Sequence, residues 1–547
     1  MRMMNMEPDS ISIHGRIYTM DEKNSEFQAL AVKDGRFLAL GTNEEIQSLA
    51  GKNTKIIDLQ GRTVIPGIID SHNHLWEVGE KLSQIRLDEC TSVEEMMALV
   101  REQAKITPAG KWILGMGWNE GYFKEVRYPT RHDIDKVTTD HPVILKRFFN
   151  MDVVNTRVLE MAGINTSTPD PQGGKIEKDT DGSPNGILRA SAKLFARKLV
   201  PLPTENEIAE ALKLAIPIMH KLGITSVIDP GLKSYEIRGY QTLYQSGGLN
   251  MRMNLMPSWH GFKDEESIDQ LDYRANELGI FSGFGDEWLR IGGLKMAIDG
   301  GTTSRTAYMY EPFVGETEVH DYNRLNPQDL YRFFRRAQEL GWDIGIHTIG
   351  DRAQDMALEQ MDKVMKEIPR PDARHNIIHA YFPTEYAMQK MAENHIAAVL
   401  QPTFIYYEGE LLFKDVGEER AHHYKPARSY LDHGVRITSS SDVESTVSAN
   451  PFPALYALVA RKNRQGIPIG PQEAITREEA LRSYTIDGTW LTREEHLKGS
   501  IAVNKLADMV VLDRNYFECP EEEIQSIRVD MTILDGKIVW DRNQTSG

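Results

Sequence analysis

Eight short apolar segments that resemble buried strands recur along the middle of this 547-residue chain, and helix-like segments separate them. Buried strands that alternate with helices predict an α/β protein with a parallel sheet, and eight such units predict a TIM-type (β/α)8 barrel. The expected strands are 63–69, 225–229, 252–256, 291–297, 343–346, 376–378, 397–400 and 436–438.

Both ends of the chain differ from this middle part. They consist of short β-rich segments interrupted by turn pairs such as Asp34-Gly35 and Asp535-Gly536. We therefore expect one small β-sandwich formed by both chain ends, with residues 1–66 as its first part and residues 491–547 as its second. The barrel is expected to occupy residues 67–490.

One interval breaks the regular spacing of the strands. The first and second expected strands are separated by residues 70–224, which include the β-like segments 111–118 and 142–147. A structureless loop of this length is implausible inside a compact domain. The interval therefore predicts a β-rich insert after strand one, at about residues 80–200.

The composition excludes several classes of partner. The formal net charge is −17, whereas nucleic acids and anionic membranes require clustered positive charge. No apolar run is long enough to span a membrane, and the first residues lack the apolar core of a signal peptide. The chain has only two cysteines, so a disulfide framework is implausible and a location in the cytoplasm is expected. The expected partner is a small-molecule substrate. A homo-oligomer remains open.

The strongest local signal is a His-x-His motif at the end of the first barrel strand. The apolar run from Val64 leads into His72 and His74, whose side chains point the same way because strand residues alternate faces. In a barrel that direction can be the active-site mouth, and two imidazoles there suit a zinc-type site. The alternative is two solvated histidines in a turn.

Three more ligand-type residues occupy corresponding places. His347 and His379 follow the fifth and sixth expected strands, and Asp442 follows the eighth through three serines. Taken singly, each is more often structural than catalytic. Together with the first strand they would place four such groups at one rim of the barrel, which predicts a metal centre.

Lys295 lies inside the apolar fourth strand, where an unpaired ammonium would be costly to bury. It could extend toward solvent or pair with a carboxylate. A second interpretation is a neutral amine that reacts with CO2, giving a carbamate that bridges two metal cations.

These motifs resemble the amidohydrolase superfamily, most closely its family-3 branch, which includes enzymes similar to N-substituted formamide deformylases. The resemblance extends over nearly the whole chain. It rests on Pro66-Gly67, Asp70-Ser71-His72-Asn73-His74, Asp299-Gly300, Ser304-Arg305-Thr306-Ala307, His347-Thr348-Ile349-Gly350-Asp351-Arg352-Ala353, Gln401-Pro402-Thr403, Ser440-Ser441-Asp442, Gly499-Ser500-Ile501 and Ala507-Asp508.

The resemblance implies a binuclear metal centre. His72 and His74 would bind the more buried metal with Asp442, and His347 and His379 would bind the second. Carbamylated Lys295 would bridge two divalent ions, expected to be zinc, with manganese, iron or cobalt also compatible with these ligands. The chain departs from the family pattern at Ile378, at Asn150-Met151 and at Asn504.

The expected reaction is hydrolysis of an amide-type C–N bond, such as an N-acyl or N-formyl bond, by metal-activated hydroxide. Asp442 would act as general base and then as general acid toward the leaving amine. Arg305 and Gln401 are candidates for substrate binding. The alternatives are a deaminase or cyclic amidohydrolase using the same site, or a non-catalytic scaffold that keeps the fold.

Overall fold

The computed structural model describes residues 7–125, 127–147, 151–171, 173–260, 269, 276–277, 279–321, 323–443, 445–446 and 448–544. The chain divides into two compact units, Met1–Leu75 with Ala215–Gly547, and Trp76–Leu214. Each unit is described by itself. The domain boundaries expected from the sequence, at residues 66 and 490, stay predictions.

Eight parallel strands of the first unit form a sheet nearly closed into a barrel, which confirms the predicted fold class. Each strand pairs with the next one along the path, and the short strand β17 (Leu289–Ile291) pairs with β16 beside it. The path runs through β8 (Ile68–Asp70), β15 (Ile224–Leu232), β16 (Arg252–His260), β18 (Leu294–Ala297), β19 (Ile344–Thr348), β20 (Asn376–His379), β21 (Ala397–Leu400) and β22 (Ile437–Ser439).

Two of the expected strands are each divided in the structure at a glycine. Segment 63–69 becomes β7 (Thr63–Pro66) in the sandwich and β8 in the barrel, with Gly67 between them. A Cβ on Gly67 would lie 2.2 Å from the Thr225 hydroxyl oxygen, so only glycine allows this close approach. Segment 291–297 is likewise divided at Gly292 and Gly293, between β17 and β18.

The ends of the first and last strands are joined by backbone hydrogen bonds. Ser71 N–H donates to Ser439 O at 3.3 Å, and Asp442 N–H donates to His72 O at 2.8 Å. His74 N–H donates to Val443 O at 2.9 Å. The segments that carry the His-x-His motif and Asp442 are therefore held side by side.

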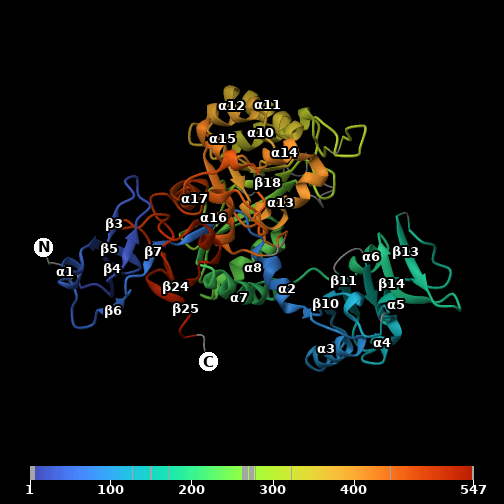
Figure 1. Cartoon of the computed structure of the whole chain (residues 1–547). Coiled ribbons are helices and arrows are strands. Elements are labelled where there is room, and N and C mark those ends of the chain that lie inside the picture. Colours follow the sequence, from blue (N-terminus) through green and yellow to red (C-terminus); the bar gives the residue numbers. More distant parts are fainter. Residues whose placement is uncertain are drawn as a thin grey trace. The chain divides into compact units, whose positions relative to one another are not determined.

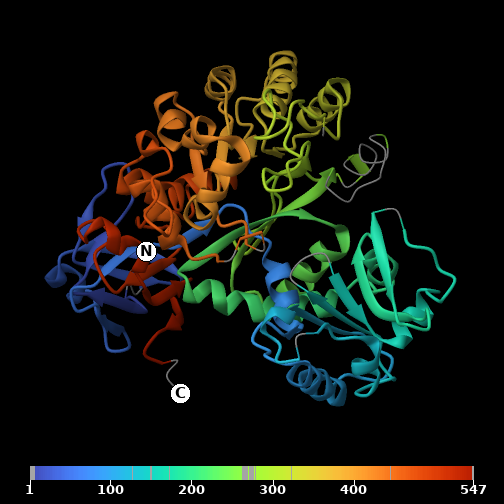
Figure 2. The same cartoon turned by 45° about the vertical axis from the view of Figure 1, so that its right-hand side comes forward.

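Helices from the barrel connections lie on the outer side of the strands (Figures 1 and 2). The sequence of α10 (Pro327–Leu340) explains where such a helix begins and ends. Asn326 caps its first turn, Pro327 is its first residue, and Gly341, with φ 80°, ends it. Its buried side chains include Leu330, Phe333, Phe334 and Ala337, a helical spacing that presents one apolar face to the sheet. Among the described residues of this unit beyond Ala215, further helices are α8 (Ser234–Gln245), α11 (Asp351–Glu367), α12 (Glu385–Glu393), α13 (Pro402–Val416), α14 (Glu418–His422), α15 (Ala427–Asp432), α16 (Pro451–Ala460), α17 (Arg477–Ser483) and α18 (Ile486–Leu491). Helix α1 (Asn43–Gln47) lies in the N-terminal part.

The two ends of the chain together form a β-sandwich, as predicted. One sheet comes from the N-terminal part alone, in the order β5-β4-β1-β6, whereas the second, β25-β24-β23-β7-β2-β3, mixes both ends. In Figure 1 the blue N-terminal strands lie beside the red C-terminal strands. The bounds are β1 (Ser10–Ile13), β2 (Arg16–Tyr18), β3 (Glu26–Phe27), β4 (Ala29–Lys33), β5 (Arg36–Gly41), β6 (Lys55–Asp58), β23 (Met509–Leu512), β24 (Val529–Leu534) and β25 (Lys537–Asp541).

The unit Trp76–Leu214 contains the predicted β-rich insert. Its six-stranded sheet has the order β13-β14-β12-β11-β10-β9, and its helix α3 (Val93–Ile106) packs on β10. The insert also contains Asn150-Met151, where the chain departs from the family pattern. Met151 begins β12, and Asn150 lies outside the described residues. The strands are β9 (Ile85–Arg86), β10 (Ile113–Trp118), β11 (Val143–Arg147), β12 (Met151–Val154), β13 (Gly174–Lys178) and β14 (Pro184–Ala190).

The helices complete this description. The insert also holds α4 (Arg131–Asp135), α5 (Thr156–Met161) and α6 (Lys193–Arg197), while α2 (Leu75–Ser83) and α7 (Glu205–Lys221) run across the two limits of the unit. Across the described ranges, no helix combines the length and the apolar character needed to span a membrane.

A buried ion pair links the barrel to the sandwich. Arg252 of β16 donates to both carboxylate oxygens of Asp508, at 2.6 Å and 2.9 Å, and the two side chains are 0% and 4% exposed. Asp508 also accepts a hydrogen bond from Asp535 N–H, and its carbonyl oxygen accepts one from Gly67 N–H. Removal of one partner would leave the other charge buried and unpaired.

We expect Arg252→Met to lower the free energy of unfolding by about 3–5 kcal/mol. The control is Arg16→Met, because Arg16 forms solvent-accessible pairs with Glu26 and Glu518 and its loss should change stability by only about 0–1 kcal/mol. Urea unfolding of both variants measures the difference. Equal effects of the two substitutions would contradict this account of the buried pair.

Candidate metal centre

The predicted ligand residues come from five strands and meet at their carboxyl ends. His72 and His74 follow β8, Lys295 lies in β18, His347 in β19, His379 ends β20 and Asp442 follows β22. All are buried except His74, whose side chain is partly exposed. The barrel topology thus gathers residues that are up to 370 positions apart, as in the pair His72 and Asp442.

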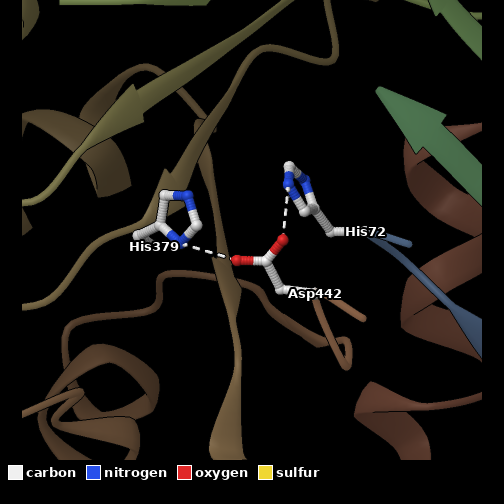
Figure 3. A group of neighbouring side chains, drawn as sticks. All are labelled: His72, His379 and Asp442. Carbon is white, nitrogen blue, oxygen red and sulfur yellow. Dashed lines mark ion pairs between the residues drawn. The ribbon is translucent and has the colours of Figure 1, made fainter. Parts of the chain in front are cut away.

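Asp442 lies at the centre of this group. Its Oδ1 is 3.6 Å from His72 Nε2 and 3.4 Å from His74 Nε2, and its Oδ2 is 4.0 Å from His379 Nδ1. Figure 3 shows the carboxylate between His72 and His379, with one oxygen directed toward each ring. One possible ligand atom from each of these three residues lies within 4.8 Å of the others, close enough to hold a metal ion.

His347 extends the group beyond these residues. Its ring centroid is 4.3 Å from that of His379, and its Nε2 lies 3.0 Å from Gly300 O. A carbonyl oxygen only accepts, so Nε2 carries the proton and Nδ1 keeps the lone pair that a metal requires. Imidazoles beside a carboxylate are a ligand set that fits zinc or a similar divalent ion.

Burial keeps these imidazoles in the neutral form that binds metals. Desolvation lowers the pKa of His347 to about 3 and lowers the pKa of His72 and His379 well below the ordinary value. The nearby Lys295 reinforces each of these shifts. The group therefore offers unprotonated nitrogens at neutral pH.

Lys295 is a buried amine. Within the described part of the chain the structure gives its amine neither a hydrogen bond nor an ion pair, and the side chain is buried at the centre of the barrel sheet. Desolvation lowers the pKa of Lys295 to about 7, although Asp442 opposes the shift. A substantial fraction of the amine is therefore neutral and nucleophilic at neutral pH.

The backbone is strained where the ligand residues point into the group. His379, Ala380 and Asp442 adopt φ values of 76°, 47° and 53°, a left-handed region that is costly for residues other than glycine. Tyr430 holds the turn after β20 through a hydrogen bond to Ala380 O at 3.1 Å. Such conformations cluster at functional sites, because surrounding packing must compensate for them.

Two buried aspartates that the sequence analysis did not single out support the group. Asp70 accepts hydrogen bonds from Ser441 Oγ and Asn73 Nδ2, at 2.6 Å and 2.9 Å. Asp299 accepts three backbone N–H groups, from Tyr308, Ile349 and Gly350. Burial raises the pKa of Asp70 to about 6 and that of Asp299 to about 7. Both residues belong to motifs shared with the amidohydrolase superfamily, Asp70-Ser71-His72-Asn73-His74 and Asp299-Gly300, and this was the sequence feature that could have identified them.

Of the two predicted substrate-binding residues, one is partly exposed and the other is buried beside a predicted metal ligand. Arg305 is partly exposed and forms ion pairs with Asp415 at 3.2 Å and Glu316 at 3.5 Å. Gln401 is fully buried, and its Oε1 lies 2.8 Å from His379 Nδ1. Gln401 lies beside the metal-ligand group, whereas the ion pairs of Arg305 involve none of the predicted ligand residues. Substrate binding by either residue stays a prediction.

The sequence also missed Lys425, a second buried lysine. It precedes α15, and its amine donates a hydrogen bond to Gln401 Oε1 at 2.9 Å. No strand pattern pointed to it, because it lies in a connection between helices.

Comparison with known proteins identifies the family. The model of the amidohydrolase family matches residues 55–540, so the chain belongs to that family, and the prediction of an amidohydrolase-type enzyme is confirmed. The chain is 28% identical to an N-substituted formamide deformylase of Arthrobacter pascens, over 98% of this chain and 99% of that protein. It is 29% identical to the protein YtcJ of Bacillus subtilis (strain 168), over 97% and 99%.

A solved structure extends the similarity to the fold. An uncharacterized metal-dependent hydrolase from Pyrococcus furiosus is 26% identical, with a TM-score of 0.76. The match covers 93% of this chain and 100% of that one. The roles of the individual ligand residues stay predictions.

The lowered pKa of His347 predicts a pH dependence of stability in the metal-free protein. Between about pH 6.5 and pH 3 the unfolded chain binds a proton on this residue that the folded chain does not, so acidification destabilises the fold. We expect His347→Gln, which keeps a donor for Gly300 O, to lose less stability on acidification than the original protein, by about 1.4 kcal/mol per pH unit. Urea unfolding at pH 6.5, 5.5 and 4.5, with chelator present, measures this.

His433→Gln is the control for this comparison. Its hydrogen bond to Glu385 raises the pKa of His433, so the stability that this residue contributes is present below about pH 6.5 and is lost only as the pH rises above that value. His433→Gln should therefore lose stability between pH 6.5 and pH 4.5 nearly as the original protein does. Parallel plots of the free energy of unfolding against pH for the original protein and His347→Gln would contradict the lowered pKa. They would show that His347 takes up its proton in the folded chain as readily as in the unfolded chain.

Proposed function

We propose that this enzyme hydrolyses an amide-type C–N bond, such as the N-acyl or N-formyl bond of a small molecule, at a binuclear metal centre. The observation that carries the proposal is the convergence of four imidazoles and one carboxylate beside the buried amine of Lys295. The similarity to an N-substituted formamide deformylase supports this class of substrate.

We assign two ligand sets to the centre. His72, His74 and Asp442 would hold one divalent ion, and His347 and His379 the other. Zinc fits these ligands, as do manganese, iron and cobalt. When bound, the metal ions supply an activated water and polarise the scissile carbonyl group.

Lys295 would connect the two ligand sets as a carbamate. The neutral amine would attack CO2: a nitrogen–carbon bond would form, one C=O π bond of CO2 would open to place the negative charge on oxygen, and one amine proton would leave to solvent. The product is an anion whose two oxygens can each face one cation, which compensates for the burial of its charge. The burial and the lowered pKa of Lys295 support this step, because only the unprotonated amine reacts.

Asp442 is the proposed proton carrier. Its carboxylate is 4% exposed and lies beside three imidazoles, so little bulk water competes for a proton that it accepts. It would take the proton of the attacking water and return it to the nitrogen of the leaving amine. An amine is a poor leaving group unless it is protonated, so the same carboxylate serves as base and then as acid.

We also propose that the enzyme acts in the cytoplasm. Cys90 and Cys519 are both free, and a reducing compartment is where unpaired cysteines are usually maintained.

Elemental analysis of the purified protein tests the bridge. We expect two divalent ions per chain, falling to one or fewer in Lys295→Ala, while Lys498→Ala, which removes a buried lysine paired with Glu494, keeps both. One ion that is unaffected by Lys295→Ala would contradict the bridge and favour a deaminase reaction. No ion in either protein would favour a non-catalytic scaffold.

A substitution at Asp442 tests the proton transfer. For Asp442→Asn we expect kcat per bound metal to fall about 10²- to 10⁴-fold on a panel of N-formyl and N-acyl amines, because the amide cannot accept the proton. Asp432→Asn, at an exposed pair with Arg428, should leave kcat unchanged. Full activity of Asp442→Asn at full metal content would exclude Asp442 as the proton carrier.

A further inference from the structure

Lys425 is a fully buried lysine that the proposed reaction does not use. Its amine lies 3.6 Å from the centre of the Tyr381 ring, and Phe404 lies on another side at 5.4 Å. The backbone N–H of Lys425 donates to Tyr381 O at 2.8 Å, which fixes the start of the side chain. The aromatic faces contact the amine, and the hydrogen bond to Gln401 Oε1 sets its direction.

The orientation of the Gln401 side chain is fixed on both sides. Its Nε2 donates to Val399 O at 3.0 Å and to Ser440 Oγ at 3.2 Å. The Ser440 hydroxyl donates its own hydrogen to Leu400 O at 2.9 Å, so its oxygen accepts from Gln401. A flipped amide would place its oxygen against two acceptors and its NH2 group against the Lys425 amine. The Oε1 atom must therefore face Lys425 and His379.

This orientation determines which nitrogen of His379 carries the proton. Gln401 Oε1 only accepts, so His379 Nδ1, 2.8 Å away, must donate to it. A neutral imidazole has one proton, and Nε2 therefore keeps the only lone pair that this ring can offer to a cation.

We propose that Lys425 is a positioning residue that, through Gln401, holds His379 in the tautomer and orientation in which Nε2 binds a metal ion. The inference rests on the proposed function in one respect, that His379 is a metal ligand. The hydrogen bond from Lys425 to Oε1 forms in both protonation states of the amine, and Val399 O holds the amide in the same orientation in either state. Loss of this donor removes one of the groups that oppose a flip of the amide, and a flipped amide would present NH2 to His379 and draw the proton to Nε2.

Titration of the metal-free protein with Co²⁺ tests the inference. The variant is Lys425→Met, which has a similar length and fits an apolar aromatic surrounding. We expect one of the two Co²⁺ ions to bind about 10- to 100-fold more weakly, as is usual when a residue that orients a ligand is lost. The other ion should keep its affinity, and this selectivity separates positioning from a general structural effect.

Lys498→Met is the matched control, because it also removes a buried lysine and should bind both ions as the original protein does. Gln401→Leu should reproduce the selective loss, and it decides the question if Lys425→Met does not fold. Two unchanged affinities in Lys425→Met, or equal weakening of both ions, would overturn the positioning role. Fewer than two ions in the original protein would overturn the proposed centre itself.

Discussion

The site depends on how the barrel closes. Asp70, at the end of β8, accepts hydrogen bonds from the backbone and the side chain of Ser441, which follows β22. This contact and the bond from Asp442 N–H to His72 O bring the two ends of the barrel path together. The His-x-His motif and the carboxylate at the centre of the ligand group therefore share one support, and a change in the closure would separate them. A buried carboxylate can do this only because its oxygens are saturated by donors.

Much of this arrangement could be predicted from the sequence. The apolar strands recur in order, and parallel strands in a barrel end at one face, so His347, His379 and Asp442 were expected near His72 without any contact information. The structure places all four together. The assembly of the sandwich from both ends was also predictable, since each end showed the same β-rich, turn-rich pattern around a different middle part.

The residues that the sequence did not reveal are those whose role depends on three-dimensional hydrogen bonding. Lys425 lies in a connection between helices, where no periodicity marks a side chain as buried. Gln401 was expected to contact substrate, yet its amide hydrogen-bonds to four groups of the protein. The division of the first strand at Gly67 was missed because the close approach of Thr225 is a tertiary feature. Such features follow from packing that a linear pattern does not encode.

Burial of the ligand residues destabilises the metal-free fold, but it also keeps their nitrogens unprotonated, which is the form that binds a metal ion. Desolvation lowers the pKa of His72, His347 and His379, so these imidazoles are largely unprotonated in the fold at neutral pH. It also lowers the pKa of Lys295 to about 7, so a substantial fraction of this amine is neutral. An arriving cation then displaces few protons and finds its ligands already oriented. The unfavourable burial of these polar groups in the metal-free chain is offset when a cation binds to them, because a ligand that binds only the native state stabilises it. The strained backbone at His379 and Asp442 fits the same account, since strain at these positions persists only where surrounding contacts determine the geometry.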